Sequence, residues 1–204
     1  MMEIDHIAIV CADLDLGCQN VEERIGLPLR PGGRHARYAT HNRLLGLGPD
    51  IYLEVIAPDP SVPAPSHPRW FALDHALEVP RVGNWLVRVP DLGAALAGAP
   101  EGAGRPVALA RDDLSWEIAV PDDGSLPMEG GWPTMLQWHG GLHPARRLPD
   151  DGVRLTTIEV RHPRADWLAR TLLPGLTGPE VRFIPAPAAA LSVELSTPGG
   201  VVWL

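Results

Sequence analysis

The sequence predicts an α+β fold built from repeated βαβββ modules. Three observations support this: a strand–helix–strand–strand–strand order in residues 1–60, a restart of that order after a proline-rich stretch, and a shorter third copy near the C-terminus. Aligning Ala12-Asp13-Leu14 with Pro90-Asp91-Leu92 places the second copy 90 − 12 = 78 residues after the first. A repeat of fixed order at this scale indicates a modular architecture.

The first module, residues 1–60, opens with a β-branched run at 4–11 that predicts a strand. A helix is expected over 13–25, because Gly26 and Pro28 would stop it. Two short strands, 34–39 and 43–47, are expected around a turn at Thr40-His41-Asn42. The strongest strand, 51–57, follows the turn Gly48-Pro49-Asp50.

Residues 61–80 are predicted to hold a proline-rich linker and a short helix at 70–77. The linker is expected because five prolines fall between positions 58 and 68. The second module, 81–140, should contain a strand at 84–89, a helix at 91–99, a hairpin of 107–111 with 115–120, and a strand at 134–139. The third, shorter module, 150–204, should contain a strand at 155–160, a helix at 164–173 and strands at 181–184, 191–197 and 201–204.

Composition excludes several classes of function. The formal charge of −8 lacks the basic face that nucleic-acid binding needs, and all 17 basic residues are arginine. Without lysine there is no Schiff-base anchor and no phosphate loop ending in lysine. Two cysteines, Cys11 and Cys18, form no disulfide framework. Because the sequence shows no signal peptide and no membrane-length apolar run, a cytoplasmic protein with no membrane partner is expected.

Three phrases carry a resemblance to a known family: Ile4-Asp5-His6-Ile7-Ala8-Ile9-Val10, Tyr52-Leu53-Glu54-Val55-Ile56 and Leu136-Gln137-Trp138-His139-Gly140-Gly141. Together with the element order, they resemble the glyoxalase-like branch of the vicinal oxygen chelate superfamily. The resemblance implies that two modules pair, each curling into half of a cup. It does not fix the reaction, because the superfamily includes lyases, isomerases, dioxygenases, transferases and non-catalytic drug-binding proteins.

The resemblance also implies metal ligands on the first and fourth strand of each module. The first module offers His6 and Glu54, which suit zinc, nickel, iron or manganese. His6 is expected to share a strand face with Ile4 and Ala8. The second module departs from the pattern, with Asn84 at 6 + 78 = 84 and Gln137 as the counterpart of Glu54. Two alternatives stay open: a divalent metal on His6, Glu54 and Gln137, or a metal-free pocket that uses these side chains as hydrogen-bonding groups.

The ligand is expected to be a small anionic metabolite. Arg88 and Arg37 are candidate carboxylate-binding residues, with Asn84 and Trp116 as further substrate contacts. The alternative is that these arginines extend into solvent and that Trp116 is buried in the core without contacting a ligand. His35 and His143 are expected to be surface residues. For His143, the alternative is a role as an acid or base.

Two functions follow. One is a metal-dependent lyase or isomerase acting on vicinal oxygens, with His139 as the catalytic base. The other is a non-catalytic small-molecule binding or sequestering protein with a degenerate metal site. A homodimer is expected, with the third module near the interface. The last strand, apolar on both faces, should be buried.

Overall fold

The computed structural model describes residues 1–75 and 79–204. The first module has the predicted element order with shifted boundaries. Its elements are β1 (Met2–Val10), α1 (Leu14–Ile25), β2 (Arg30–His35), β3 (Thr40–Gly46) and β4 (Tyr52–Pro58). The Asp13 carboxylate caps α1 by accepting a hydrogen bond from Leu16 N at 2.9 Å. The helix ends at Gly26, whose φ of 77° is favourable for glycine.

The turn expected at residues 40–42 lies at residues 36–39 instead. Tyr38 N donates to His35 O at 3.1 Å, and Ala39 has a φ of 48°, so the chain reverses before Thr40. Residues 40–42 therefore belong to β3. This shift matters for function, because it places Asn42 inside a strand of the cup.

The second module contains β5 (Arg81–Arg88), α2 (Leu92–Ala97), β6 (Arg105–Arg111), β7 (Leu114–Val120) and β8 (Thr134–His139). Asp91 caps α2 by accepting from Ala94 N at 2.9 Å, as Asp13 does for α1. The two caps therefore confirm the 78-residue offset structurally. Turns replace the helix expected at 70–77 over the described residues 70–75, and residues 76 and 77 of that helix lie outside the described residues.

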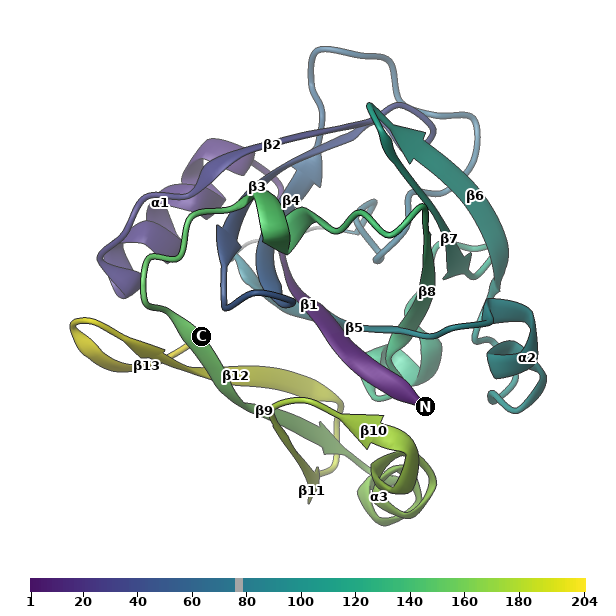
Figure 1. Cartoon of the computed structure of the whole chain (residues 1–204). Coiled ribbons are helices and arrows are strands. Elements are labelled where there is room, and N and C mark those ends of the chain that lie inside the picture. The colour runs from purple at the N-terminus through teal and green to yellow at the C-terminus, as the bar shows by residue number, and fades with distance from the viewer. Residues whose placement is uncertain (76–78) are drawn as a thin grey trace.

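The larger sheet joins both modules into one curled cup (Figure 1). Its strand order is β2-β3-β4-β1-β5-β8-β7-β6, so the modules meet where β1 pairs antiparallel with β5. In each module the first strand pairs in parallel with the last, β1 with β4 and β5 with β8. The outermost strands β2 and β6 approach each other across the ring from β1 and β5. The cup interior is therefore lined by side chains from both modules.

The third unit contains β9 (Arg154–His162), α3 (Ala165–Leu172), β10 (Leu176–Thr177), β11 (Glu180–Pro185), β12 (Ala190–Thr197) and β13 (Gly200–Trp203). The short β10 pairs with β1, and the other strands form a separate sheet of order β11-β9-β12-β13. In this sheet β9 pairs in parallel with β11, the strand that follows the helix. The unit thus has the predicted element order but a different strand pairing from the two cup modules.

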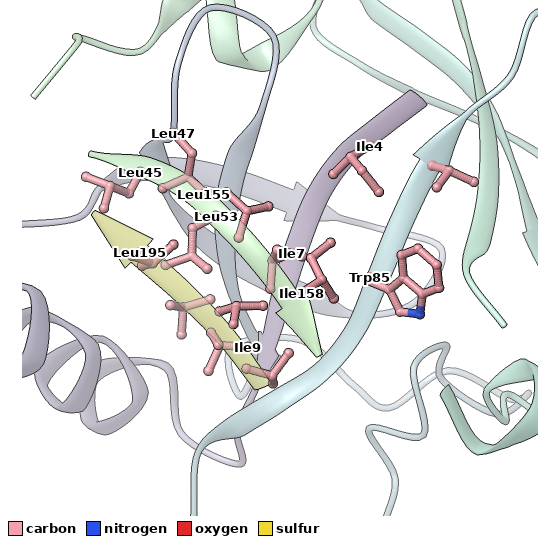
Figure 2. Packing of buried hydrophobic residues seen from close by; sticks show 14 of the residues in the cluster. Ile4, Ile7, Ile9, Leu45, Leu47, Leu53, Trp85, Leu155, Ile158 and Leu195 are labelled. Carbon is pink, nitrogen blue, oxygen red and sulfur yellow. The ribbon is translucent and has the colours of Figure 1, made fainter. Parts of the chain in front are cut away.

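The third unit covers the outer face of the cup (Figure 2). Side chains from β1, β3, β4 and β5 pack there against β9 and β12 in one buried apolar layer. Its members include Ile4, Ile7, Ile9, Leu45, Leu53, Trp85, Leu155, Ile158 and Leu195. This layer leaves the inner face of the sheet free to form the site.

The last strand is an edge strand, so the expectation that both of its faces are buried is wrong. Val201 is 66% and Trp203 is 37% exposed, whereas Leu204 packs partly against the core. A homodimer stays a prediction. Among residues 1–75 and 79–204, no helix combines the length and the apolar character that crossing a membrane requires.

Candidate functional site

The cup encloses a cavity of ≈ 30 Å³, which has room for one or two water-sized groups. Strands of both modules line it, together with the turn at residues 70–71 and Pro144. Its polar or titratable lining residues are His6, His35, Asn42, Tyr52, Glu54 and Arg111, and its aromatic walls include Trp70, Trp116 and Trp138. Such a mixture of apolar walls and few polar groups is typical of small-molecule sites.

A β-bulge in β1 brings Asp5 and His6 together. Ile4 pairs with Val87 and His6 with the preceding residue Leu86, so Asp5 is an extra residue without a partner on β5. Because the bulge changes the alternation, Ile4 packs on the outer face with Ile7, not with His6 as expected. Asp5 and His6 can then hydrogen-bond although they are neighbours in sequence.

Asp5 is the central acceptor of the site. It is fully buried; its Oδ1 accepts from His6 Nδ1 at 2.6 Å, and its Oδ2 accepts from His143 Nε2 at 3.0 Å and Trp138 Nε1 at 2.9 Å. Burial alone would raise the pKa of Asp5, but the hydrogen bonds and charges of His143 and His6 outweigh it and hold the pKa well below its usual range. Asp5 is therefore a carboxylate that fixes both imidazoles.

Glu54 faces His6 from β4. Its Oε2 lies 3.7 Å from His6 Nε2, and its Oε1 accepts a short hydrogen bond from Asn42 Nδ2. Asn42 is itself held by Gly33 N, which donates to Asn42 Oδ1 at 2.6 Å. Glu54 is thereby fixed by one oxygen and presents the other to the imidazole.

His35 and Arg111 meet where β2 and β6 approach. Arg111 Nη1 lies 3.4 Å from His35 Nε2, and His35 Nδ1 lies 3.1 Å from Thr40 Oγ1. Burial, and to a lesser degree the charges of Arg111 and His6, lower the pKa of His35 to about 3. The neutral ring can accept from Arg111 and donate to Thr40.

The structure changes the assignment of the second-module counterparts. Ala8 pairs with Glu54, and the residue 78 positions after Ala8 is Leu86, which pairs with Thr134. The counterpart of Glu54 is therefore Thr134 and not Gln137. Asn84, the counterpart of His6, donates to Thr134 Oγ1 at 2.9 Å, and both side chains are buried. The second module thus carries a neutral pair where the first carries His6 and Glu54.

The structure does not bring Gln137 and His139 to the cavity. Gln137 Oε1 accepts from Leu92 N at the start of α2. His139 Nε2 lies 3.3 Å from Glu117 Oε2, and its side chain is 42% exposed. Trp138, between them, lines the cavity, so the alternation of β8 directs both neighbours to its other face.

The predicted substrate-binding residues separate into two groups. Trp116 lines the cavity, whereas Asn84 is buried, does not line it and donates to Thr134. Arg88 pairs with Glu3 at 2.6 Å and donates to Asp50 O at 2.7 Å, while its Nη1 lies 3.7 Å from Asp5 Oδ2. Arg37 lies over the Tyr38 ring and is not a lining residue of the cavity.

The donor set does not fit the divalent metal that the resemblance implies. Among the described residues, only His6 Nε2 and Glu54 Oε2 face each other in the cavity. Asn84 and Thr134 are neutral and do not line it; Asn84 donates to Thr134 and leaves its Oδ1 without a hydrogen-bond partner in the described part of the chain. Catalytic metal sites usually take three protein ligands. Arg111 also places a positive charge in the same cavity. No group of three His, Cys, Asp or Glu side chains within the described residues is arranged to hold a metal ion.

Sequence reasoning missed Asp5, Asn42, Trp70 and Arg111, and it favoured a surface position for His143 over an acid–base role. The bulge that turns Asp5 inward has no sequence signal of its own, and the sequence predicts a turn at Asn42. The sequence also indicates a solvated loop position for His143, yet this residue is 8% exposed and bound to Asp5. Arg111 ends β6, and only the curvature of the sheet shows that this end meets β2.

The family match and one solved structure agree with the fold. The family described as "Glyoxalase-like domain" matches residues 4–175. A hypothetical protein from Staphylococcus aureus has a similar structure, with a TM-score of 0.59 and 13% identity over 93% of this chain and 88% of that chain. A methylmalonyl-CoA epimerase from Mycobacterium tuberculosis has a TM-score of 0.43 and 20% identity over 66% of this chain and 85% of that chain. Among curated proteins, no significant match was found.

Proposed function

The chain belongs to the glyoxalase-like domain family, and we propose that it binds a small polar molecule in the cup and transfers a proton on that molecule through His6. The observation that carries this proposal is the row Asp5–His6–Glu54 at the wall of the cavity. Because Nδ1 donates to Asp5, the neutral ring keeps Nε2 as its acceptor. A carboxylate that fixes the tautomer and orientation of an imidazole is a common arrangement in general acid–base catalysis.

Glu54 is the second acid–base group in this proposal. The 3.7 Å between His6 Nε2 and Glu54 Oε2 is longer than a hydrogen bond, so an atom bound between the two groups can contact both. His6 would accept a proton from the ligand. Glu54 would either bind a second proton of the ligand or donate a proton back to it. The walls formed by Trp116 and Trp138 would keep water away from the transfer.

Solvent exchange tests the proposal directly, because it reports proton transfer whatever the complete reaction is. A panel of small 2-hydroxy and 2-oxo acids is incubated with the protein in D₂O, and loss of carbon-bound protons next to the carbonyl or hydroxyl is followed by NMR. Loss of a general base typically costs roughly 10²- to 10⁴-fold, so His6→Ala should reduce exchange by that order. His139→Ala should exchange at the wild-type rate, because His139 pairs with Glu117 away from the cavity.

Equal exchange in wild type and His6→Ala would contradict the proposal. Saturable binding with no exchange of any bound compound would instead support the non-catalytic binding function. The smallness of the cavity, ≈ 30 Å³, favours compounds of a few heavy atoms for the first panel.

A further inference from the structure

The cavity contains hydrogen-bond donors that its own side chains do not fully match. Arg111 is one of them: its Nη1 lies 3.4 Å from His35 Nε2, but no carboxylate of the described residues lies within ion-pair distance of its guanidinium. Other arginines near the cup are paired, as Arg88 is with Glu3 and Arg147 with Asp113. Among the residues described, the one side chain that hydrogen-bonds to Arg111 is His35. Since His35 is neutral at physiological pH, it orients the guanidinium without balancing its charge.

Trp70 is the second donor. It is 3% exposed, it lines the same cavity, and its Nε1 has no hydrogen-bond partner in the described part of the chain. Tyr38 and Phe71 stack on its ring with centroids 4.5 and 4.8 Å away, so the indole is held in place. Buried donors without acceptors are rare in folded proteins and often mark a bound water or ion.

The two donors belong to one cluster. The His35 ring meets the Trp70 ring edge-on, with centroids 4.9 Å apart, and the same His35 contacts Arg111. This cluster lies at β2 and β6, across the ring from β1, which carries His6 (Figure 1). A ligand in the cavity would therefore have Arg111 and Trp70 on one side and His6 with Glu54 on the other.

We propose that Arg111 and Trp70 bind the carboxylate of a small carboxylic acid in this cavity. A guanidinium and a carboxylate match as planar groups, and an indole N–H can donate to a further lone pair. A singly charged anion fits better than a dianion such as phosphate, because Asp5 and Glu54 already place negative charge nearby. The inference rests on the proposed function only in that both use the same cavity.

Gly33 allows Arg111 to enter the cavity. A Cβ at Gly33 would lie 2.5 Å from Arg111 Cδ and 2.7 Å from its Nε and Nη1. These atoms are the flexible end of a side chain, so Gly33→Ala should displace the guanidinium and leave the fold intact. The substitution keeps the charge of Arg111 and the Gly33 N–H that binds Asn42. It therefore tests the position of the guanidinium separately from its presence.

The experiment is an NMR titration of the ¹⁵N-labelled protein with sodium acetate, with acetamide as the neutral isostere and with ionic strength held constant by NaCl. Acetate should shift the Trp70 indole N–H saturably, and acetamide should not. Arg111→Gln should weaken acetate binding about ten-fold or more, as expected for the loss of a charged hydrogen bond. Gly33→Ala should weaken it in the same direction. Arg170→Gln, an exposed change of equal charge in α3, should bind as the wild type does.

Equal responses to acetate and acetamide, or wild-type acetate binding by a folded Arg111→Gln protein, would overturn the proposal. Sodium phosphate forms a separate arm, and tighter binding of phosphate than of acetate would contradict the carboxylate assignment. Failure of this inference is thus distinguishable from failure of the proton-transfer proposal, which concerns exchange and not acetate affinity.

Discussion

The two halves of the cup share one fold and differ in chemistry. In the first module, the paired positions on the first and fourth strands hold His6 and Glu54, and both face the cavity. In the second module, the same positions hold Asn84 and Thr134, which hydrogen-bond to each other, are buried and do not line the cavity. The second half contributes apolar and aromatic wall, together with Arg111.

This difference shows that the two copies of a duplicated module can take different roles, one supplying titratable groups and the other the walls of the cavity. Asn84 donates to Thr134 and neither side chain lines the cavity, so the second half mainly shapes its walls. The first half keeps the titratable groups and adds Asp5 at a bulge. β5 has the equivalent bulge at Gly83, since Ala8 pairs with Asn84 and Ile9 with Val82, but glycine brings no side chain to that position. Positive charge in the cavity comes from Arg111, across the ring from His6, so in the proposed carboxylate complex the guanidinium supplies the charge that meets the anion.

The largest expected effect comes from substituting one buried polar residue in each half. Asp5→Asn places an amide N–H₂ among the donors of His6, His143 and Trp138, so the free energy of unfolding should fall by about 3–5 kcal/mol, as when a buried charge pair is broken. Asn84→Ala removes one neutral hydrogen bond and should cost about 1–3 kcal/mol. Urea unfolding measures both, and a smaller loss for Asp5→Asn than for Asn84→Ala would break the comparison.

The next effect is the dependence of stability on pH. The folded-state pKa of His35 is about 3, below its usual value of 6.5, so the unfolded chain binds the proton more readily than the folded one. The stability that this histidine supports is complete above pH 6.5 and is lost as the pH falls from 6.5 toward 3. The slope of unfolding free energy should approach about 1.4 kcal/mol per pH unit from this group. The stability that the Asp5 carboxylate contributes is lost only below about pH 3.8, because the folded-state pKa of Asp5 lies below that unfolded value.

His35→Gln is the variant that isolates this effect. Glutamine can still hydrogen-bond to Thr40 and Arg111 but does not titrate. Urea unfolding of wild type and His35→Gln between about pH 7.5 and pH 4.5 should show a shallower decline in the variant. Parallel declines would assign the acid sensitivity to other groups of the first half.

Much of the fold could be predicted from the sequence, because local signals specify it. The Asp13 and Asp91 caps fix where each helix begins, and the apolar runs around His6 and Glu54 fix the strands that carry them. The predicted resemblance to glyoxalase-like proteins is confirmed by the family match over residues 4–175. The predicted β8 agrees with the structure at both ends.

The site was harder to predict, because its composition depends on register and curvature. A one-residue bulge turned Asp5 inward and Ile4 outward. Assigning Gln137 as the counterpart of Glu54 rested on similar neighbours, and strand pairing shows that the position belongs to Thr134. Arg111 and His35 are 76 positions apart, and they meet only because the outermost strands of the sheet approach each other. Neither feature has a local sequence signal.

The most direct test of the central claim is the tautomer of His6. If Asp5 holds this imidazole for proton transfer, long-range ¹H–¹⁵N NMR on the neutral ring should show the proton on Nδ1 and none on Nε2, the nitrogen near Glu54. Asp5→Asn should weaken this preference in whatever part of the sample stays folded. A wild-type His6 ring that carries its proton on Nε2 would contradict the account, because Glu54 and not Asp5 would then hold the ring, and no free base would face the cavity.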